Sequence, residues 1–178
     1  MPQFNRSVQT VKQHPMPAGD LVILTACDVE YLGYAIRLIL SIDSFSPGQH
    51  VALHVVNPDG TVRGRLLRLE QTLRATRLSV SLETGSIESW GVDARKTYYA
   101  CSRFLRLAEL MGEGKSDFLV LDADAVVVSP IDGNFSDKPD PEVCLLRRDQ
   151  GEEPVPDHLA VAAGTVWLRN LPHVRKFA

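Results

Sequence analysis

The sequence predicts an α/β fold with a mostly parallel sheet and helices on both faces. Short apolar runs rich in β-branched residues recur along the chain, and such runs are typical of strands buried on both faces. Amphipathic helical patterns separate the earlier runs, and this alternation favours parallel strands joined by crossover helices. The 178 residues are 44% hydrophobic, which suffices for one domain with its own core.

The first half of the chain predicts three strands and two helices in alternation. Strands are expected at residues 21–25, 51–55 and 78–82. A helix from Tyr31 has its apolar positions on one face and ends at Pro47-Gly48. A second helix, at residues 62–73, has a basic face that we interpret mainly as solvated surface. That face consists of Arg63, Arg65, Arg68 and Arg74.

The second half predicts one more helix and several strands. Residues 84–96 are expected to form a loop, followed by a helix at 100–111 that ends at Gly112 and Gly114. Residues 169–172 have the pattern of a helix start, so we expect the chain to be incomplete at its C-terminus. The expected strands are 118–121, 126–128, 143–146 and 159–168, the last interrupted at Gly164.

Composition limits the domain organisation, the partners and the location. Residues 1–19 are expected to form a flexible lead-in to a single domain at residues 20–178. The net charge of −3 does not favour a nucleic-acid or anionic-membrane partner, and no apolar run is long enough to cross a bilayer. Three widely spaced cysteines and the lack of an apolar signal core favour a cytoplasmic protein.

Two carboxylates, Asp122 and Asp124, directly follow the buried run at residues 118–121. Ligands of open α/β sheets bind at the carboxyl ends of strands, so these side chains are placed to meet one. A backbone turn after Asp122 would let both carboxylates reach one cation. Hard oxygen ligands favour Mg²⁺ or Mn²⁺, and such ions usually also hold substrate phosphates. We therefore predict that this pair binds a metal.

Two other interpretations of the Asp-x-Asp pair remain open at this point. The carboxylates can simply face water at a strand end, since so short a motif occurs often by chance. The pair also fits the haloacid-dehalogenase phosphatases, in which the first Asp is a nucleophile and the second an acid/base. That family normally carries the motif near the start of the chain and needs further conserved elements after it, for which only about fifty residues remain.

Three separate blocks together resemble family 8 of the GT-A glycosyltransferases. They are residues 26–31 after the first strand, Tyr98-Tyr99 with Arg103, and residues 121–126 around the Asp pair, followed by Ala163-Gly164. The resemblance implies a GT-A-like, Rossmann-related fold from about residue 21 to residue 168. It also implies retaining transfer of a sugar from a nucleotide-sugar donor, usually a UDP-hexose, with Mn²⁺ or Mg²⁺.

The same resemblance implies a set of site residues. Asp122 and Asp124 would hold the metal that bridges the donor diphosphate. The acceptor, whether a glycan, a lipid-linked sugar or a protein, is left open. The donor-binding residues would be Ala26, Asp28, Tyr31, Arg103, Ala123 and Gly164.

Individual roles follow from the positions in the family pattern. Tyr31 would stack on uracil, and Ala26 and Asp28 would contact the base. Arg103 would orient the diphosphate or the aspartates, and Gly164 with its neighbours would line the sugar pocket.

Each role also has a purely structural alternative. Tyr31 can pack its helix onto the sheet, and Asp28 can cap that helix. Arg103 can be a surface residue, in which case Arg106, one turn on, would take its role.

The sequence departs from the family pattern at two points. Ala162 stands where the family usually has an Asn that contacts the donor sugar. The His-x-x-Gly-x-x-Lys-type segment that supplies a third metal ligand is not found, and we expect it beyond Ala178. His158 and His173 lack that context. A nucleotide-sugar-binding or interaction domain without catalysis is therefore a second hypothesis.

Overall fold

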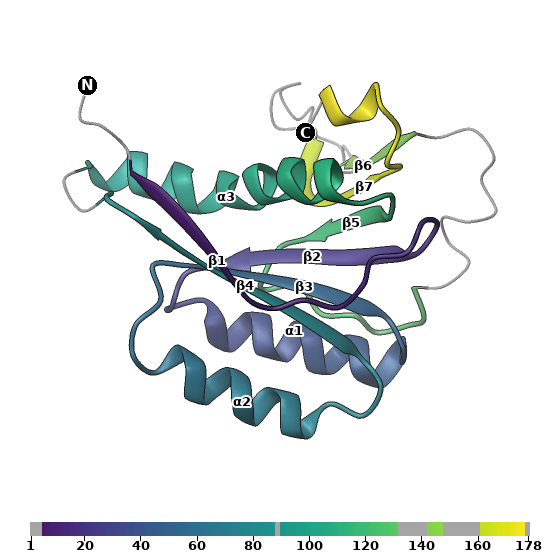
Figure 1. Cartoon of the computed structure of the whole chain (residues 1–178), viewed down its shortest axis with the longest axis horizontal. Helices are drawn as coiled ribbons and strands as arrows, with labels where there is room; N and C mark the ends of the chain where they lie inside the picture. The colour runs from purple at the N-terminus through teal and green to yellow at the C-terminus, as the bar shows by residue number, and fades with distance from the viewer. Residues whose placement is uncertain (1–4, 88–89, 132–141, 148–160, 177–178) are drawn as a thin grey trace, which may run out of the picture.

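A computed structural model describes residues 5–87, 90–131, 142–147 and 161–176. These residues form one seven-stranded sheet in the order β1-β4-β3-β2-β5-β7-β6 (Figure 1). The strands are β1 (Arg6–Lys12), β2 (Leu21–Cys27), β3 (His50–Val56), β4 (Arg77–Gly85), β5 (Asp117–Leu121), β6 (Val143–Arg147) and β7 (Val161–Leu168). The helices are α1 (Leu32–Phe45), α2 (Val62–Thr72), α3 (Val92–Glu113) and the short 3₁₀ helix η2 (Val174–Lys176).

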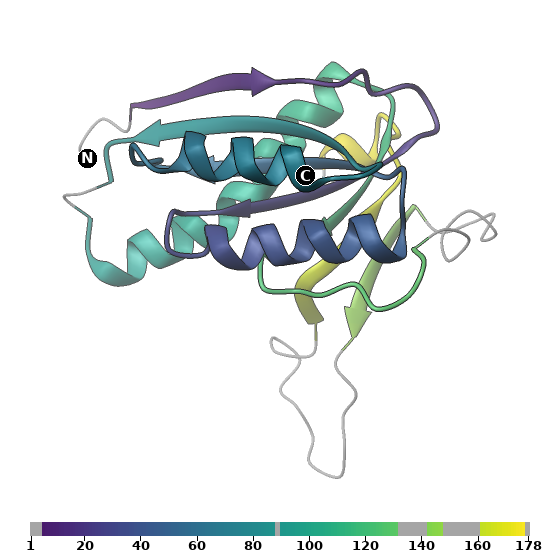
Figure 2. The same ribbon diagram turned by 90° about the horizontal axis from the view of Figure 1, so that it is seen from below.

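The sheet is parallel in its centre and antiparallel toward its edges. Strands β4, β3, β2 and β5 run in one direction, whereas β1 and β7 run against their neighbours. Helices α1 and α2 cover one face of the sheet and α3 covers the other (Figures 1 and 2). The predicted fold class, a mostly parallel α/β sheet with helices on both faces, is confirmed.

The connections create a switch point between β2 and β5. From β2 the chain moves outward through α1 to β3 and through α2 to β4. Helix α3 then carries it back across the opposite face to β5, on the other side of β2 (Figure 1). The carboxyl ends of β2 and β5 are therefore neighbours, at the place where ligands bind in open α/β folds.

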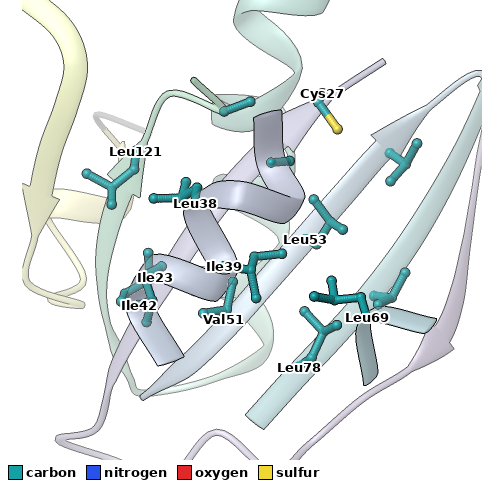
Figure 3. Packing of buried hydrophobic residues seen from close by; sticks show 14 of the residues in the cluster. Ile23, Cys27, Leu38, Ile39, Ile42, Val51, Leu53, Leu69, Leu78 and Leu121 are labelled. Atoms are coloured by element: carbon teal, nitrogen blue, oxygen red, sulfur yellow. The ribbon is translucent and has the colours of Figure 1, made fainter. Parts of the chain in front are cut away.

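Two apolar layers sandwich the central strands. On one face, Ile23 of β2 and Leu53 of β3 pack with Ile39 of α1 (Figure 3). On the other face, Leu24 of β2 packs in the layer that contains Met111 of α3. Neighbouring residues of one strand thus enter different layers. This burial on both faces explains why the strands are continuous apolar runs in the sequence.

The expected lead-in is wrong for residues 6–12, which form strand β1. This strand pairs antiparallel with β4 in a register that places Val8 opposite Glu83. A side-chain contact adds to the pairing, because Arg6 Nε donates to the buried Glu83 Oε2 at 2.6 Å. The strand is polar along most of its length, so its sequence has no apolar pattern from which a strand could be predicted.

The expected strand at residues 126–128 is also wrong. The chain turns directly after β5, where Ala125 N–H donates to the Asp122 carbonyl at 3.0 Å. Val126 and Val128 are then 63% and 74% exposed. The segment runs beside α1 (Figure 2), where Val127 N–H donates to Ser41 Oγ at 2.9 Å. An early turn and an anchor on α1 therefore replace strand pairing here.

The other differences concern element boundaries. The expected loop at residues 84–96 is shorter, because β4 continues to Gly85 and α3 begins at Val92. Gly112 lies inside α3, and β7 continues through Gly164. Positions 159 and 160 of the expected last strand, and His158, lie outside the described residues. Among the described helices, none combines the length and apolar character needed to cross a membrane.

Asp43 of α1 ties the sheet to the helical layer. Its carboxylate is buried and accepts the backbone N–H groups of Arg74, Ala75 and Thr76 at 2.9–3.0 Å. Burial alone would raise the pKa of Asp43, but these hydrogen bonds outweigh burial and lower the pKa to about 2. The ionised side chain thus fixes the connection from α2 to β4.

We expect Asp43→Asn to lower the free energy of unfolding at pH 7 by about 2–4 kcal/mol, because an amide cannot accept all three N–H groups. A carboxylate whose pKa is lower in the folded state stabilises above its ordinary pKa and loses that contribution as the pH falls toward 2. The variant should therefore lose less stability than the wild type between about pH 4 and pH 2.

Urea unfolding at several pH values measures both effects. Ser44→Ala, at the exposed neighbouring position, is the control and should change stability by less than about 0.5 kcal/mol. If the free energy of unfolding changed equally with pH in Asp43→Asn and in the wild type, the stabilising role of the ionised Asp43 would be contradicted.

Candidate functional site

The sequence-predicted residues gather at the carboxyl ends of β2 and β5. The parallel register that pairs Leu24 with Val120 brings the ends of the two strands side by side. Asp28 follows β2 directly and Asp122 follows β5 directly. The switch point of the sheet therefore contains acidic side chains from two separate loops.

The position of Asp122 depends on Gly164 of β7 in two ways, through a backbone hydrogen bond and through the room that glycine leaves for the carboxylate. Its N–H donates to the Gly164 carbonyl of β7 at 2.9 Å. A Cβ atom built on Gly164 would lie 3.1 Å from Asp122 Cγ and would overlap the carboxylate oxygen Oδ2. Only glycine at position 164 leaves room for this carboxylate, which remains 40% exposed.

The turn after Asp122 separates the next two residues. Ala123 is buried in the apolar layer beneath α1, whereas Asp124 is exposed. The backbone turn that a shared cation requires is present, because Ala125 N–H closes it on the Asp122 carbonyl. Ala123 therefore anchors the loop in the core while the carboxylates of Asp122 and Asp124 face solvent.

Arg103 of α3 forms an ion pair with Asp122 Oδ1. The arginine side chain is 14% exposed and its guanidinium carbon lies 5.1 Å from the centre of the Phe104 ring. Arg106 instead pairs with Glu109 at 2.8 Å. Of the two arginines considered from the sequence, Arg103 is thus the one that contacts Asp122.

The loop between β2 and α1 presents an aromatic surface. Asp28 Oδ1 accepts the backbone N–H of Tyr31, the residue before α1, at 2.9 Å, and so holds the turn that leads into the helix without capping its first turn. Tyr31 is 50% exposed, and its ring centre lies 5.6 Å from that of Tyr34. Ala26, at the end of β2, is half-buried. Tyr31 therefore does not pack onto the sheet and offers its ring to solvent.

Arg65 joins this loop and was missed by the sequence analysis, which placed it on a solvated helix face. Its Nη1 donates to the Val29 carbonyl at 3.4 Å. The sequence could not predict this contact, because Arg65 is one of several arginines on the helix and its partner lies in a loop more than thirty residues earlier. A guanidinium from α2 thus contacts the loop that carries Tyr31.

Asp122 and Asp124 are the residues of this site that could hold a divalent cation together with phosphates. Asp122 and Asp124 supply hard oxygen atoms, and Arg103 engages one oxygen of Asp122. Across the part of the chain that the structure describes, no group of three or more His, Cys, Asp or Glu side chains could hold a metal. Mg²⁺ is commonly held by one or two carboxylates and completed by water and substrate phosphates.

Neither a protein-family model nor a curated protein matches the sequence. Solved structures do match the fold. The apo glycosyltransferase GlyE of Streptococcus pneumoniae TIGR4 has a TM-score of 0.58 and 13% identity over 89% of this chain. Mouse xyloside xylosyltransferase 1 has a TM-score of 0.54 and 14% identity over 85% of this chain. The bifunctional glycosyltransferase WbbM has a TM-score of 0.58 and 14% identity over 93% of this chain.

The chain is similar in fold to these three glycosyltransferases. It spans 37% of the GlyE chain, 67% of the mouse xylosyltransferase chain and 34% of the WbbM chain. The likeness is one of architecture, since few residues are shared at these identities. It agrees with the GT-A-like sheet expected from the sequence.

A second polar cluster was also missed. It lies on the α3 face of the sheet around Glu83 of β4 and His54 of β3, both fully buried. The signal was available, because a His and a Glu inside apolar strands require partners. The partners of Glu83 were not predicted. Arg6 was expected in the flexible lead-in, and Tyr98 was considered only as part of the family resemblance.

We expect Gly164→Ala to lower the free energy of unfolding by about 1–3 kcal/mol, because the new methyl group overlaps the Asp122 carboxylate. The same substitution in an Asp122→Ala background should cost less than about 0.5 kcal/mol, since the overlapping group is gone. Chemical unfolding of the two single variants and the double variant measures this coupling.

Gly112→Ala is the matched control. Gly112 lies in α3 with nothing near the position of an added Cβ, so its substitution should be neutral or slightly stabilising. Additive costs for Gly164→Ala and Asp122→Ala would show that the two residues do not touch.

Proposed function

We propose that this chain is the nucleotide-sugar-binding domain of a metal-dependent, retaining glycosyltransferase that uses a UDP-hexose. The observation that supports the proposal most directly is the position of Asp122. It lies at the switch point of a glycosyltransferase fold, paired with Arg103 and adjacent to the loop that carries the exposed Tyr31. A diphosphate needs positive charge, and a nucleobase needs an apolar face, within reach of each other.

The donor would lie across the carboxyl ends of β2 and β5. Neighbouring strands are about 4.8 Å apart, so loops from both can contact one extended nucleotide-sugar. The uracil would stack on Tyr31, with Ala26 and Asp28 at its edge. The diphosphate would lie at Asp122 and Asp124, and the sugar would lie beside Gly164.

Asp122 and Asp124 would hold the Mn²⁺ or Mg²⁺, which offsets the charge that develops on the departing UDP. Arg103 would add a fixed positive charge at the same place and orient Asp122. Gly164 leaves room for the Asp122 carboxylate, because a side chain at position 164 would overlap it. The sugar passes through an oxocarbenium-like state when its bond to UDP breaks, as in glycoside cleavage.

The second candidate function is nucleotide-sugar binding without transfer. It is favoured by the two-carboxylate site, which lacks a third ligand among the described residues. Turnover of UDP-glucose or UDP-galactose to free UDP, followed with Mn²⁺ present, separates the two functions. Release of UDP supports the transferase, whereas binding without release supports the second candidate.

We expect Asp122→Ala combined with Asp124→Ala to abolish Mn²⁺-dependent UDP binding. In the wild type, Mn²⁺ alone should bind weakly, because two carboxylates leave most of its ligands to water, and more tightly when UDP is present. Isothermal titration of Mn²⁺ with and without UDP measures both. Glu113→Ala, which removes an exposed carboxylate at the end of α3, is the control. Unchanged binding in the double variant would refute the metal assignment.

We expect Tyr31→Ala to weaken UDP binding about ten-fold or more, since stacking on an aromatic ring contributes roughly 1–3 kcal/mol per base. Affinity for Mn²⁺ alone should stay nearly the same. Phe45→Ala is the matched control, because Phe45 is a comparably exposed aromatic residue at the far end of α1, the helix that begins directly after Tyr31. Equal UDP affinity in Tyr31→Ala and Phe45→Ala, with both folded by circular dichroism, would exclude stacking on Tyr31.

A further inference from the structure

A buried polar network joins α3 to the sheet on the side away from β5. At its centre is Glu83 of β4, whose side chain is fully buried. Its Oε2 accepts Arg6 Nε at 2.6 Å and lies 3.0 Å from His54 Nε2, and its Oε1 accepts the hydroxyl of Tyr98 of α3. His54 Nδ1 lies 2.9 Å from Ser81 Oγ. The carboxylate is thus hydrogen-bonded from β1, β3 and α3 together.

The network continues along α3 and balances its charges. Glu109 of α3 pairs with Arg6 and accepts Arg106 Nη1 at 2.8 Å. Two guanidinium groups therefore face two carboxylates. Burial alone would raise the pKa of Glu83, but hydrogen bonds from His54 and Tyr98 outweigh burial and lower the pKa to about 2. Glu83 is consequently ionised at neutral pH and depends on all its partners.

The positions on α3 put Tyr98 and Glu109 at one edge of the buried face of the helix and Arg103 within that face. At about 100° per residue, Tyr98 and Glu109 lie within roughly 20° of each other around the helix axis. Arg103 is five residues from Tyr98, or roughly 140° away. Leu110 and Leu107 of the same helix, roughly 120° and 180° from Tyr98, lie in the apolar layer against the sheet, so Arg103 lies between them around the axis. The network thus fixes one edge of this buried face to β4 and β1, and Arg103 extends from the same face to Asp122.

We propose that Tyr98 and Glu83 are positioning residues for Arg103 at the donor site. Apolar packing alone lets a helix rotate or slide by small amounts, because side chains such as Leu and Met adapt. A buried carboxylate does not allow such movement. Loss of even one of its hydrogen bonds leaves a buried charge partly unpaired, which costs more free energy than an apolar contact in the same place. The Tyr98–Glu83 hydrogen bond therefore selects one rotation of α3, the one in which Arg103 reaches Asp122. The proposal rests on the proposed function, in which Arg103 faces the donor diphosphate.

A double-mutant cycle tests the proposal. Tyr98→Phe removes only the hydroxyl that binds Glu83, and Arg103→Ala removes the group to be positioned. We expect Tyr98→Phe to weaken Mn²⁺-dependent UDP binding by about five- to ten-fold in the wild-type background and by less than about two-fold in Arg103→Ala. A network that only stabilises the fold would give equal effects in both backgrounds, and that result would overturn the proposal.

Two further variants keep the test decisive. Tyr99→Phe, at the neighbouring position of α3, is the matched control and should leave UDP affinity unchanged. If Tyr98→Phe does not fold, Glu109→Gln loosens the same network from its outer, partly exposed end, and should show the same dependence on Arg103. Absence of any effect on UDP binding in a folded variant would also overturn the proposal.

A stability measurement separates this proposal from the proposed function. The coupling between Arg103→Ala and Asp122→Ala in the free energy of unfolding needs no nucleotide. We expect this coupling to be clear in the wild type and to fall by at least half in Tyr98→Phe. If the wild type fails to bind UDP, the proposed function is wrong, and the coupling alone then decides the positioning role. An equal coupling in both backgrounds would contradict it.

Discussion

A carboxylate at the end of a fully buried strand must be paired or hydrated, and the surroundings of Asp122 meet both needs. Arg103 supplies the pairing from α3, and the turn closed by Ala125 opens the loop to water. Gly164 supplies room from β7 by having no side chain. Three segments far apart in the sequence are thus constrained by one carboxylate. The architecture of the site follows from the requirement to keep that charge in place.

Helix α3 carries this requirement across the sheet. It is the crossover that returns the chain to β5, so its position decides where β5 and Asp122 lie. Its apolar side chains give the contact area, whereas its polar side chains give the rotation. Glu83 holds Tyr98 at one edge of the buried face, and Asp122 pairs with Arg103 from within that face. Without the contact at Tyr98, the adaptable apolar side chains would tolerate a small rotation of α3 that displaces Arg103.

The sequence was a good guide where burial is local and a poor one where contacts are distant. The strand at residues 118–121 was predictable because burial on both faces leaves a continuous apolar run. Strand β1 was not, since it is held by pairing with β4 and by Arg6 rather than by its own pattern. The run at 126–128 misled because its valines follow a turn. Gly164 was predicted to line a sugar pocket, but its contact with Asp122 joins strands that the sequence cannot align.

The geometry around Asp122 also bears on whether the Asp-x-Asp pair provides a phosphatase nucleophile or metal ligands. A phosphatase nucleophile needs a carboxylate oxygen that is free to approach phosphorus. Here Arg103 engages Oδ1, and Oδ2 lies against Gly164, so attack would require both contacts to break. A metal ligand has no such need, because a carboxylate can share an oxygen between a guanidinium and a cation while it keeps its place. The exposed Tyr31 ring on the neighbouring loop adds a surface that a nucleobase needs and a simple phosphate ester does not. The contacts of Asp122 therefore favour the proposed role of metal ligand over that of phosphatase nucleophile.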